Sequence, residues 1–269
     1  MAVTKAVVMA RGLGSRMRRA GEADLSPEQA AAAASGAKAM MPVGERPFLD
    51  HLLTRLADAG LTDICLVIGP EHQAVRRYYD SLPQRRVRIS YAIQAEPRGT
   101  ADAVAAAAGF TGRDRFVVVN GDNLYPVDSL RRLAAEPGLA TVGFSPGGLV
   151  ANSNIPADRI AAFALLTADS AGNVADLIEK PGTQEVAAAG TGRWVSMNCW
   201  LLGPPVFEAC AAIPLSPRGE LEVVDAVRWL IDAGERISLV TSTEGVWDLS
   251  SRGDVAVVAR VLENGLVLL

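Results

Sequence analysis

The sequence predicts an α/β fold built on a doubly wound, mostly parallel sheet with an inserted antiparallel region. The first half alternates short, almost entirely apolar runs with amphipathic segments, and strands that are covered on both faces have this composition. After residue 126 the pattern changes to hairpins that contain glycine and proline, which favours antiparallel strands. The β-α-β-α order implies right-handed crossovers, and such sheets bind ligands at the carboxyl ends of their strands.

The first half contains four expected strands and four expected helices. The strands are expected at 6–9, 63–68, 87–93 and 116–120, and the helices at 26–36, 47–59, 71–79 and 99–108. Helix 47–59 carries apolar residues at helical spacing and precedes Gly60, a typical left-handed end of a helix. Helix 26–36 has Ser26 as N-cap, Pro27 at its first position and Gln29 in its first turn, so local chemistry alone specifies it.

The second half contains three expected strands and two expected helices. The strands are expected at 160–166, 174–178 and 194–202, and the helices at 220–233 and 255–263. The chain shows no internal repeat, and we expect a single domain over residues 1–269.

The composition excludes several classes of partner. The 269 residues include 30 acidic and 26 basic side chains, a net charge of −4, which argues against binding to nucleic acid or to an anionic membrane surface. The three cysteines are widely spaced in apolar runs, as is typical of buried thiols in a reducing, cytoplasmic compartment. We expect no membrane span and no export signal, because no apolar run reaches the length of about 18 residues that a span requires.

Lysine usage singles out two residues. Of the 26 basic residues only three are lysine, namely Lys5, Lys38 and Lys180, and the other 23 are arginine. Arginine and lysine are not interchangeable where a compact ammonium is needed. Lys38 and Lys180 are therefore candidate site residues, whereas Lys5, near the start of the chain, is expected to be an ordinary surface charge.

A glycine-containing loop follows the first strand. Its sequence, MARGLGSR at 9–16, contains Gly12-Leu13-Gly14-Ser15 and then Arg16. A strand that ends in G-x-G can direct backbone N–H groups at a phosphate, and an arginine beyond it adds a second anion contact. The loop lacks the third glycine of a dinucleotide fingerprint and the Gly-Lys-Ser/Thr of a Walker motif, so it indicates a phosphate loop of another kind.

Seven motifs in order carry a family resemblance. They are MARGLGSR at 9–16, KAMMPV at 38–43, Gln94 with GTADA at 99–103, NGDNLY at 120–125, EKP at 179–181, RGELE at 218–222 and WD at 247–248. Together they resemble the sugar-1-phosphate nucleotidyltransferase family, the pyrophosphorylases that make nucleotide sugars, over about residues 4–260. The resemblance implies a Rossmann-like nucleotide-diphospho-sugar transferase fold, with a nucleotide-binding part at about 1–125 and a sugar-phosphate-binding part at about 126–250.

The resemblance also implies the site. The nucleotide would be bound by Ala10, Gly12, Leu13, Gly14, Ser15, Gln94, Gly99 and Thr100, and the sugar phosphate by Glu179, Lys180, Ser196 and Asn198. Arg16 and Lys38 would hold the β- and γ-phosphates, and Asp122 with Asp248 would hold Mg²⁺, a cation that prefers carboxylate and phosphate oxygens. Asp248 departs from the family pattern W-x-D-x-G-T, because Trp247 is adjacent to it and Ser250-Ser251 replaces Gly-Thr.

The base and the sugar depend on finer resemblances. GDNLY and RGELE resemble thymidylyltransferases, whereas GTADA and Ser196-Met197 resemble adenylyltransferases that make ADP-glucose. We expect ATP, dTTP or GTP as the donor, with a preference for adenylyl transfer to a glucose-like 1-phosphate. Arg11 replaces a small residue of the family, and Ala164 and Asn198 replace glycines, so the acceptor could instead be a modified hexose or a cyclitol 1-phosphate.

Two other functions remain open at this point. A GT-A-like glycosyltransferase would use a D-x-D metal motif, but Asp122 lacks the second aspartate. A sensor could bind a nucleotide sugar without turnover, but it would not need Arg16, Lys38, Asp122 and Lys180 together. The apolar ending at 266–269 would cover either a partner or the chain's own core, and we expect a homo-oligomer. The two histidines lie among charged residues and are expected in solvent.

Overall fold

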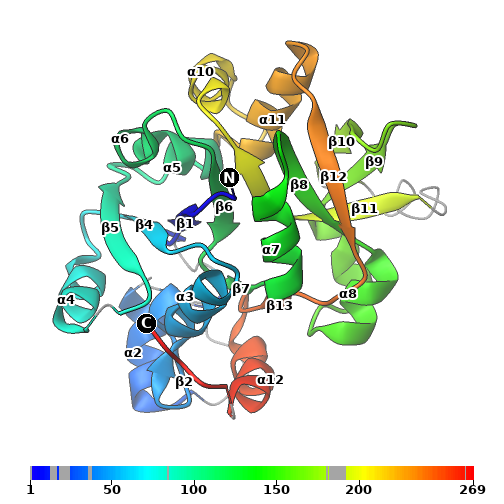
Figure 1. Cartoon of the computed structure of the whole chain (residues 1–269). Helices are drawn as coiled ribbons and strands as arrows, with labels where there is room; N and C mark the ends of the chain where they lie inside the picture. The colour runs from blue at the N-terminus through cyan, green and yellow to red at the C-terminus, as the bar shows by residue number, and fades with distance from the viewer. Residues whose placement is uncertain are drawn as a thin grey trace.

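The computed structural model describes residues 2–12, 17, 25–35, 38–83, 85–179, 181, 192–263 and 265–269 (Figure 1). Within these residues one large sheet has the strand order β10-β9-β11-β6-β1-β4-β5, with β8 beside β11 and β12 beside β8. The strands are β1 (Lys5–Met9), β4 (Asp63–Ile68), β5 (Arg88–Ile93), β6 (Phe116–Asn120), β8 (Leu139–Phe144), β9 (Ala164–Ala168), β10 (Val174–Ile178), β11 (Arg193–Leu202) and β12 (Ile237–Ser242).

The predicted division of the sheet is confirmed. Strands β6, β1, β4 and β5 are parallel neighbours, as the β-α-β-α order implies. The long strand β11 then runs antiparallel to β6, β8 and β9, while β8 and β12 form a parallel pair. Strand β11 therefore joins the parallel half of the sheet to the antiparallel region.

Helices cover both faces of the sheet, because successive strand residues point to opposite sides. In β1, Ala6 and Val8 belong to one core cluster and Val7 to the other. The first cluster includes side chains of α3 (Phe48–Asp58), α7 (Val127–Ala135) and α12 (Arg252–Leu262). The second includes side chains of α5 (Thr100–Ala106), α10 (Pro205–Ala212) and α11 (Val223–Asp232). Figure 1 shows the two groups of helices on either side of the sheet.

Short elements complete the described chain. The helices are α2 (Pro27–Ser35), α4 (Gln73–Ser81), α6 (Ala108–Thr111) and α8 (Pro146–Asn152), with 3-10 turns η1 (Lys38–Met40) and η2 (Ala157–Ala162). Two small antiparallel pairs lie outside the main sheet: β2 (Pro42–Val43) with β3 (Arg46–Pro47), and β7 (Asn123–Leu124) with β13 (Trp247–Asp248).

Local chemistry sets two helix ends as expected. The Ser26 hydroxyl accepts a hydrogen bond from the Gln29 backbone N–H at 3.2 Å, and the Gln29 side-chain oxygen accepts one from the Ser26 N–H at 3.0 Å. This is the reciprocal pattern of a capping box. Gly60 follows α3 with φ +90°, a conformation that glycine adopts without a steric penalty.

The sequence prediction was wrong at several elements. The strand expected at 160–166 begins only at Ala164, because residues 157–162 form η2, and the helix expected at 99–108 divides into α5 and α6. Helices α7, α8 and α10 and strands β8 and β12 were not predicted. The side chains of His51 and His72 are buried, at 7% and 5% exposure, because α3 and the start of α4 pack closely against the core. The three cysteines are free and buried, as expected.

The C-terminal residues dock on the chain itself. The Leu268 N–H donates to the Thr54 hydroxyl of α3 at 3.2 Å, and the Leu269 carbonyl accepts from the Arg85 N–H at 3.2 Å. Leu266 remains 75% exposed. Among the described helices, none combines the length and the apolar character that crossing a membrane requires.

Candidate active site

A cleft of about 460 Å³ lies where the parallel half of the sheet meets the antiparallel region. Its walls include every predicted site residue that the structure describes. These are Ala10, Gly12, Lys38, Gln94, Gly99, Thr100, Asp122, Glu179, Ser196, Asn198 and Asp248. The predicted residues Leu13, Gly14, Ser15, Arg16 and Lys180 lie outside the described residues. Residues from seven separate sequence motifs thus surround one space.

Two strand ends form the floor of the cleft. Strand β1 ends at Met9, whose carbonyl accepts a hydrogen bond from the Gly121 N–H at 3.0 Å, directly after β6. A Cβ on Gly121 would lie 3.0 Å from that carbonyl oxygen and 3.2 Å from the Cα of Ala10. Glycine at 121 therefore lets the loop after β6 approach the loop after β1, which brings Asp122 beside the glycine-containing segment.

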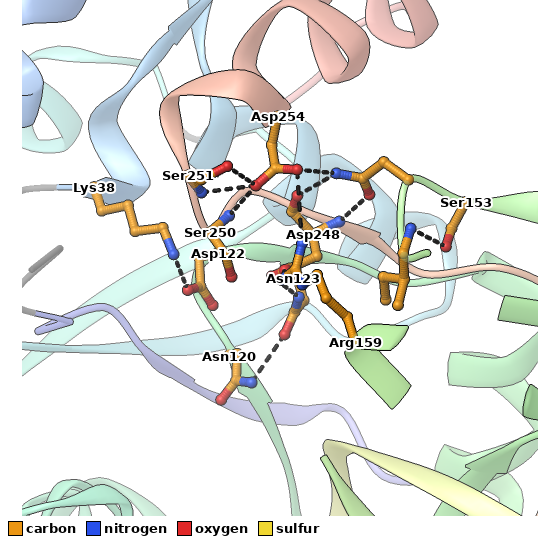
Figure 2. Close-up of polar contacts among 12 residues, drawn as sticks. Lys38, Asn120, Asp122, Asn123, Ser153, Arg159, Asp248, Ser250, Ser251 and Asp254 are labelled. Carbon is orange, nitrogen blue, oxygen red and sulfur yellow. Dashed lines mark hydrogen bonds and ion pairs between the residues drawn. The ribbon is translucent and has the colours of Figure 1, made fainter. Parts of the chain in front are cut away.

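Lys38 forms an ion pair with Asp122 across the cleft. The Lys38 ammonium lies 2.6 Å from Asp122 Oδ2, and its side chain is 10% exposed against 33% for Asp122 (Figure 2). Lys38 is the first residue of the turn η1, which follows α2 in the chain. Lys5, by contrast, pairs with the exposed Asp114 at the far end of β1. Lys38 therefore lines the cleft, whereas Lys5, expected as an ordinary surface charge, is partly buried and also donates to the Phe110 and Thr111 carbonyls at 3.1 and 3.2 Å.

Asp248 lies beside Asp122 because β13 pairs with β7. The Leu249 N–H donates to the Asp122 carbonyl at 2.9 Å, and Asp248 is opposite Asn123 in the register. The Asp248 side chain is 4% exposed; one oxygen accepts from Asn123 Nδ2 at 2.9 Å and the other pairs with Arg159 (Figure 2). Burial, followed by the negative charge of Asp122, raises the pKa of Asp248.

Arg159 was not singled out by the sequence. It comes from η2, and its guanidinium also lies 3.7 Å from Asp254 Oδ1. The Asn154 amide nitrogen donates to the Asp248 carbonyl at 2.6 Å and to Asp254 at 2.8 Å. No sequence motif marks Arg159, because its partner Asp248 is 89 residues away. The cluster fixes Asp248 in position and balances its charge.

Gln94 and Gly99 form another part of the cleft wall. The Gln94 side-chain amide donates to the Gly99 carbonyl at 3.0 Å and to Asp102 Oδ2 at 2.8 Å. Both amide hydrogens are thereby used, so the carbonyl oxygen Oε1 is the group that Gln94 can offer to a ligand. Gly99 has φ +121°, and a Cβ there would lie 2.4 Å from the Leu221 carbonyl oxygen.

Arg11 lines the cleft as a buried cation. Its guanidinium donates to the Gln94 backbone carbonyl and to both carboxylate oxygens of Glu71, at 3.2 and 3.3 Å. The arginine that departs from the family pattern is thus fixed under Gln94 by a bidentate ion pair. A bidentate carboxylate pair is the geometry for which arginine is best suited.

Charged residues gather at the other end of the cleft, around Glu179. Arg218 contributes from the R-G-E-L-E motif and pairs with Glu222 at 3.2 Å and Glu220 at 2.9 Å. Desolvation of the carboxylate, followed by the charge of Glu222, raises the pKa of Glu179 to about 7, although the residue as a whole is exposed. The R-G-E-L-E motif predicts no role for Arg218, but the charge of Arg218 acts on Glu179 in the cleft, which makes Arg218 a candidate anion contact.

Comparisons with known proteins agree with this arrangement. The sequence matches the family described as "Nucleotidyl transferase" over residues 5–248. A glucose-1-phosphate thymidylyltransferase of Streptomyces griseus is 31% identical over 268 residues, covering 98% of this chain and 66% of the relative. The chain therefore spans just under two thirds of that relative. A UTP--glucose-1-phosphate uridylyltransferase of Haloferax volcanii is 27% identical over 239 residues, covering 88% of this chain and 87% of the relative.

A solved structure has the same fold at low identity. A UDP-glucose pyrophosphorylase complexed with UDP-glucose matches with a TM-score of 0.77 and 16% identity, covering 98% of this chain and 100% of that one. At this identity the likeness concerns the fold alone. It agrees with the mixed sheet and flanking helices described above.

Proposed function

This chain belongs to the nucleotidyl transferase family, and on that premise we propose that it is a sugar-1-phosphate nucleotidyltransferase. It transfers a nucleotidyl group from a nucleoside triphosphate to a sugar or cyclitol 1-phosphate, releasing pyrophosphate and forming a nucleotide sugar. The parallel half of the cleft wall takes the triphosphate, and the wall from β9, β10 and β11 takes the sugar phosphate. The names of the relatives and the positions of the cleft residues support this assignment.

The reaction is an in-line displacement at the α-phosphorus. An anionic oxygen of the sugar phosphate attacks, a new P–O bond forms, and the bond from the α-phosphorus to the bridging oxygen breaks, so that pyrophosphate leaves with the electron pair. The nucleophile already carries its charge, so a general base is not needed. Positioning and charge neutralisation supply most of the catalysis in such transfers.

The pairing of Lys38 with Asp122 is the observation that carries the proposal. In our proposal the α-phosphorus lies beside this pair, because Lys38 and Asp122 line the same cleft as the residues assigned to both substrates. In our proposal Lys38 and Arg16 neutralise the β- and γ-phosphates, and Lys180 with Glu179, Ser196 and Asn198 holds the sugar phosphate. Only three of the 26 basic residues are lysines, and one of them, Lys38, lines this cleft. This supports a role for Lys38 in binding phosphate.

The carboxylates of Asp122 and Asp248 suit Mg²⁺. They are hard oxygen donors, Asp122 directly before β7 and Asp248 on its partner β13, and their two negative charges are balanced by Lys38 and Arg159. Mg²⁺ is usually bound through one or two carboxylates together with substrate phosphates. When bound, Mg²⁺ would neutralise the charge that develops on the phosphates.

For the base, we propose a pyrimidine triphosphate, dTTP or UTP. The sequence motifs favoured adenylyl transfer, but the curated relatives above are named for thymidylyl and uridylyl transfer. The hydrogen bonds of Gln94 support the change, because both of its amide hydrogens are used and its Oε1, an acceptor, has no donor among the described residues. An acceptor matches the imide N–H of thymine or uracil, whereas the equivalent ring nitrogen of adenine is itself an acceptor.

The test is a pyrophosphate-release assay with Mg²⁺. Five nucleoside triphosphates (ATP, GTP, CTP, UTP and dTTP) are crossed with hexose and cyclitol 1-phosphates. We expect turnover with dTTP or UTP and a glucose-like 1-phosphate. Turnover with ATP at least tenfold above both pyrimidines would contradict the base assignment and restore the adenylyl prediction. No turnover with any pair would contradict the reaction itself.

A further inference from the structure

Asn198 is the residue of β11 with the least ordinary backbone. Its φ is +52°, and among the described residues it is the only one besides glycine with a positive φ. Asparagine tolerates this left-handed region better than most residues, but it still favours glycine. The register between β11 and β8 shifts between Ser196 and Trp200, so Asn198 lies within a bulge. Bulges beside active sites commonly redirect a side chain.

The Asn198 carboxamide belongs to a directional series of hydrogen bonds. The indole N–H of the buried Trp200 donates to Asn198 Oδ1 at 3.2 Å, and Asn198 Nδ2 donates to Asn120 Oδ1 at 3.5 Å. Asn120 Nδ2 then donates to Asn123 Oδ1 at 2.8 Å, and Asn123 Nδ2 donates to Asp248 Oδ1 at 2.9 Å. Figure 2 shows the part from Asn120 to Asp248. We call these residues the amide relay.

Counting donors shows what the amide relay leaves for a ligand. Each carboxamide has two N–H donors and one accepting oxygen. Asn198 and Asn120 each use one N–H and their oxygen within the relay, and in the described part of the chain neither has a second acceptor for its remaining N–H. Both side chains are partly exposed and line the cleft. Asn198 of β11 and Asn120 at the end of β6 therefore each have one N–H that can serve a ligand in the cleft.

We propose that Asn198, supported by Asn120, determines acceptor specificity by donating a hydrogen bond to one sugar oxygen. This inference rests on the proposed function and names the feature of the acceptor that the site reads, an oxygen substituent of the sugar ring. The backbone of the bulge and the bond from Nδ2 to Asn120 hold the second amide N–H of Asn198 in one orientation, so an acceptor without that oxygen leaves the donor unpaired. Leaving a polar group unpaired costs more than the bond contributes when it forms.

A purely structural role for Asn198 can be separated from recognition. Asn198 also satisfies the indole N–H of Trp200, which is fully buried. The variant Trp200→Phe removes that donor and leaves the Asn198 side chain in the cleft. The variant Asn198→Gly removes the side chain and suits a φ of +52°. Both variants therefore lose the hydrogen bond between Asn198 and Trp200, but only Asn198→Gly also removes the N–H donor to the sugar.

The experiment measures kcat/KM for glucose 1-phosphate and for its 2-, 3-, 4- and 6-deoxy analogues, at a saturating concentration of the accepted triphosphate. We expect kcat/KM of the wild-type protein to be about tenfold or more lower for one deoxy analogue than for glucose 1-phosphate, because that analogue leaves the Asn198 donor unpaired. A tenfold change corresponds to about 1.4 kcal/mol. Asn198→Gly should reduce that ratio to about threefold or less by losing activity with glucose 1-phosphate, and Trp200→Phe should keep it. The KM for the triphosphate should change less than about twofold in either variant.

The outcomes separate this inference from the proposed function. Turnover of glucose 1-phosphate with an unchanged deoxy ratio in Asn198→Gly would overturn the specificity role and leave the nucleotidyltransferase proposal standing. An equal loss of the ratio in Trp200→Phe would also overturn it, because the effect would then be structural. No turnover with any of the five triphosphates and any of the hexose or cyclitol 1-phosphates would contradict the proposed function and this inference together.

Discussion

Replacing Gly99 by alanine tests how the two halves of the cleft are held together. Gly99 precedes α5 with φ +121° and ψ −178°, a region that is essentially restricted to glycine. The neighbouring residues bond to the R-G-E-L-E segment: the Leu221 N–H donates to the Arg98 carbonyl at 2.7 Å and the Ala101 N–H to the Leu221 carbonyl at 2.8 Å. An alanine Cβ would lie 2.4 Å from that Leu221 oxygen and 2.7 Å from the Leu221 nitrogen.

The expected loss follows from these contacts. Strain at such a residue costs about 1–3 kcal/mol, and the two backbone hydrogen bonds contribute about 0.5–1.5 kcal/mol each. Gly99→Ala should therefore lower the free energy of unfolding by about 2–6 kcal/mol, which at about 2–4 °C per kcal/mol is a fall in Tm of about 4–24 °C. Because the segment also carries Arg218, the KM values for both substrates should rise.

A matched glycine provides the control. Gly109 lies in α6, and a Cβ there would meet nothing within 4 Å. Gly109→Ala should keep or slightly raise the Tm, because alanine favours a helix by up to about 1 kcal/mol. Both variants are compared by thermal unfolding and by turnover. If Gly99→Ala unfolds within 1 °C of Gly109→Ala, the argument from the Gly99–Leu221 contact is refuted.

Three further predictions concern the charges in the cleft. Lys38→Met should reduce kcat at least about 100-fold, whereas Lys5→Met should lower the Tm and spare kcat, because Lys5 bonds to Asp114 and to the Phe110 and Thr111 carbonyls away from the cleft; equal kcat values would remove Lys38 from the reaction. Asp122→Asn should weaken Mn²⁺ binding, measured by electron paramagnetic resonance with the triphosphate present, about tenfold or more; an unchanged Mn²⁺ affinity would exclude it as a ligand. The pKa of Glu179 is raised to about 7, so the folded protein retains a proton that the unfolded chain releases near 4.5. Its contribution to stability should therefore fall as the pH rises from about 4.5 to 7, and Glu179→Gln should flatten this part of the curve measured by urea unfolding; an identical slope in wild type and variant would contradict the shift.

Local features of the fold were predictable from the sequence because neighbouring residues determine them. The box of Ser26 and Gln29 sets the start of α2, and Gly60 sets the end of α3. Strands β4 and β6 have the expected bounds, since both are mostly apolar runs with clear limits. The strand expected at 160–166 was wrong at its start, because the turn η2 places Arg159 beside Asp248 and is stabilised by that distant partner.

The sequence by itself determined many of the residues that line the cleft. Motifs such as Gln94 with Gly99 are recognisable in the chain, and the order of strands brings their ends to one edge of the sheet. The tertiary structure alone decided how those residues are paired. The ion pair of Arg159 with Asp248 joins residues that are 89 positions apart in the sequence. The amide relay connects Trp200 with Asp248, which are 48 positions apart. Contacts between residues so far apart in the sequence depend on the register of β7, β11 and β13. Packing of the whole sheet sets this register, and it leaves no local pattern in the sequence.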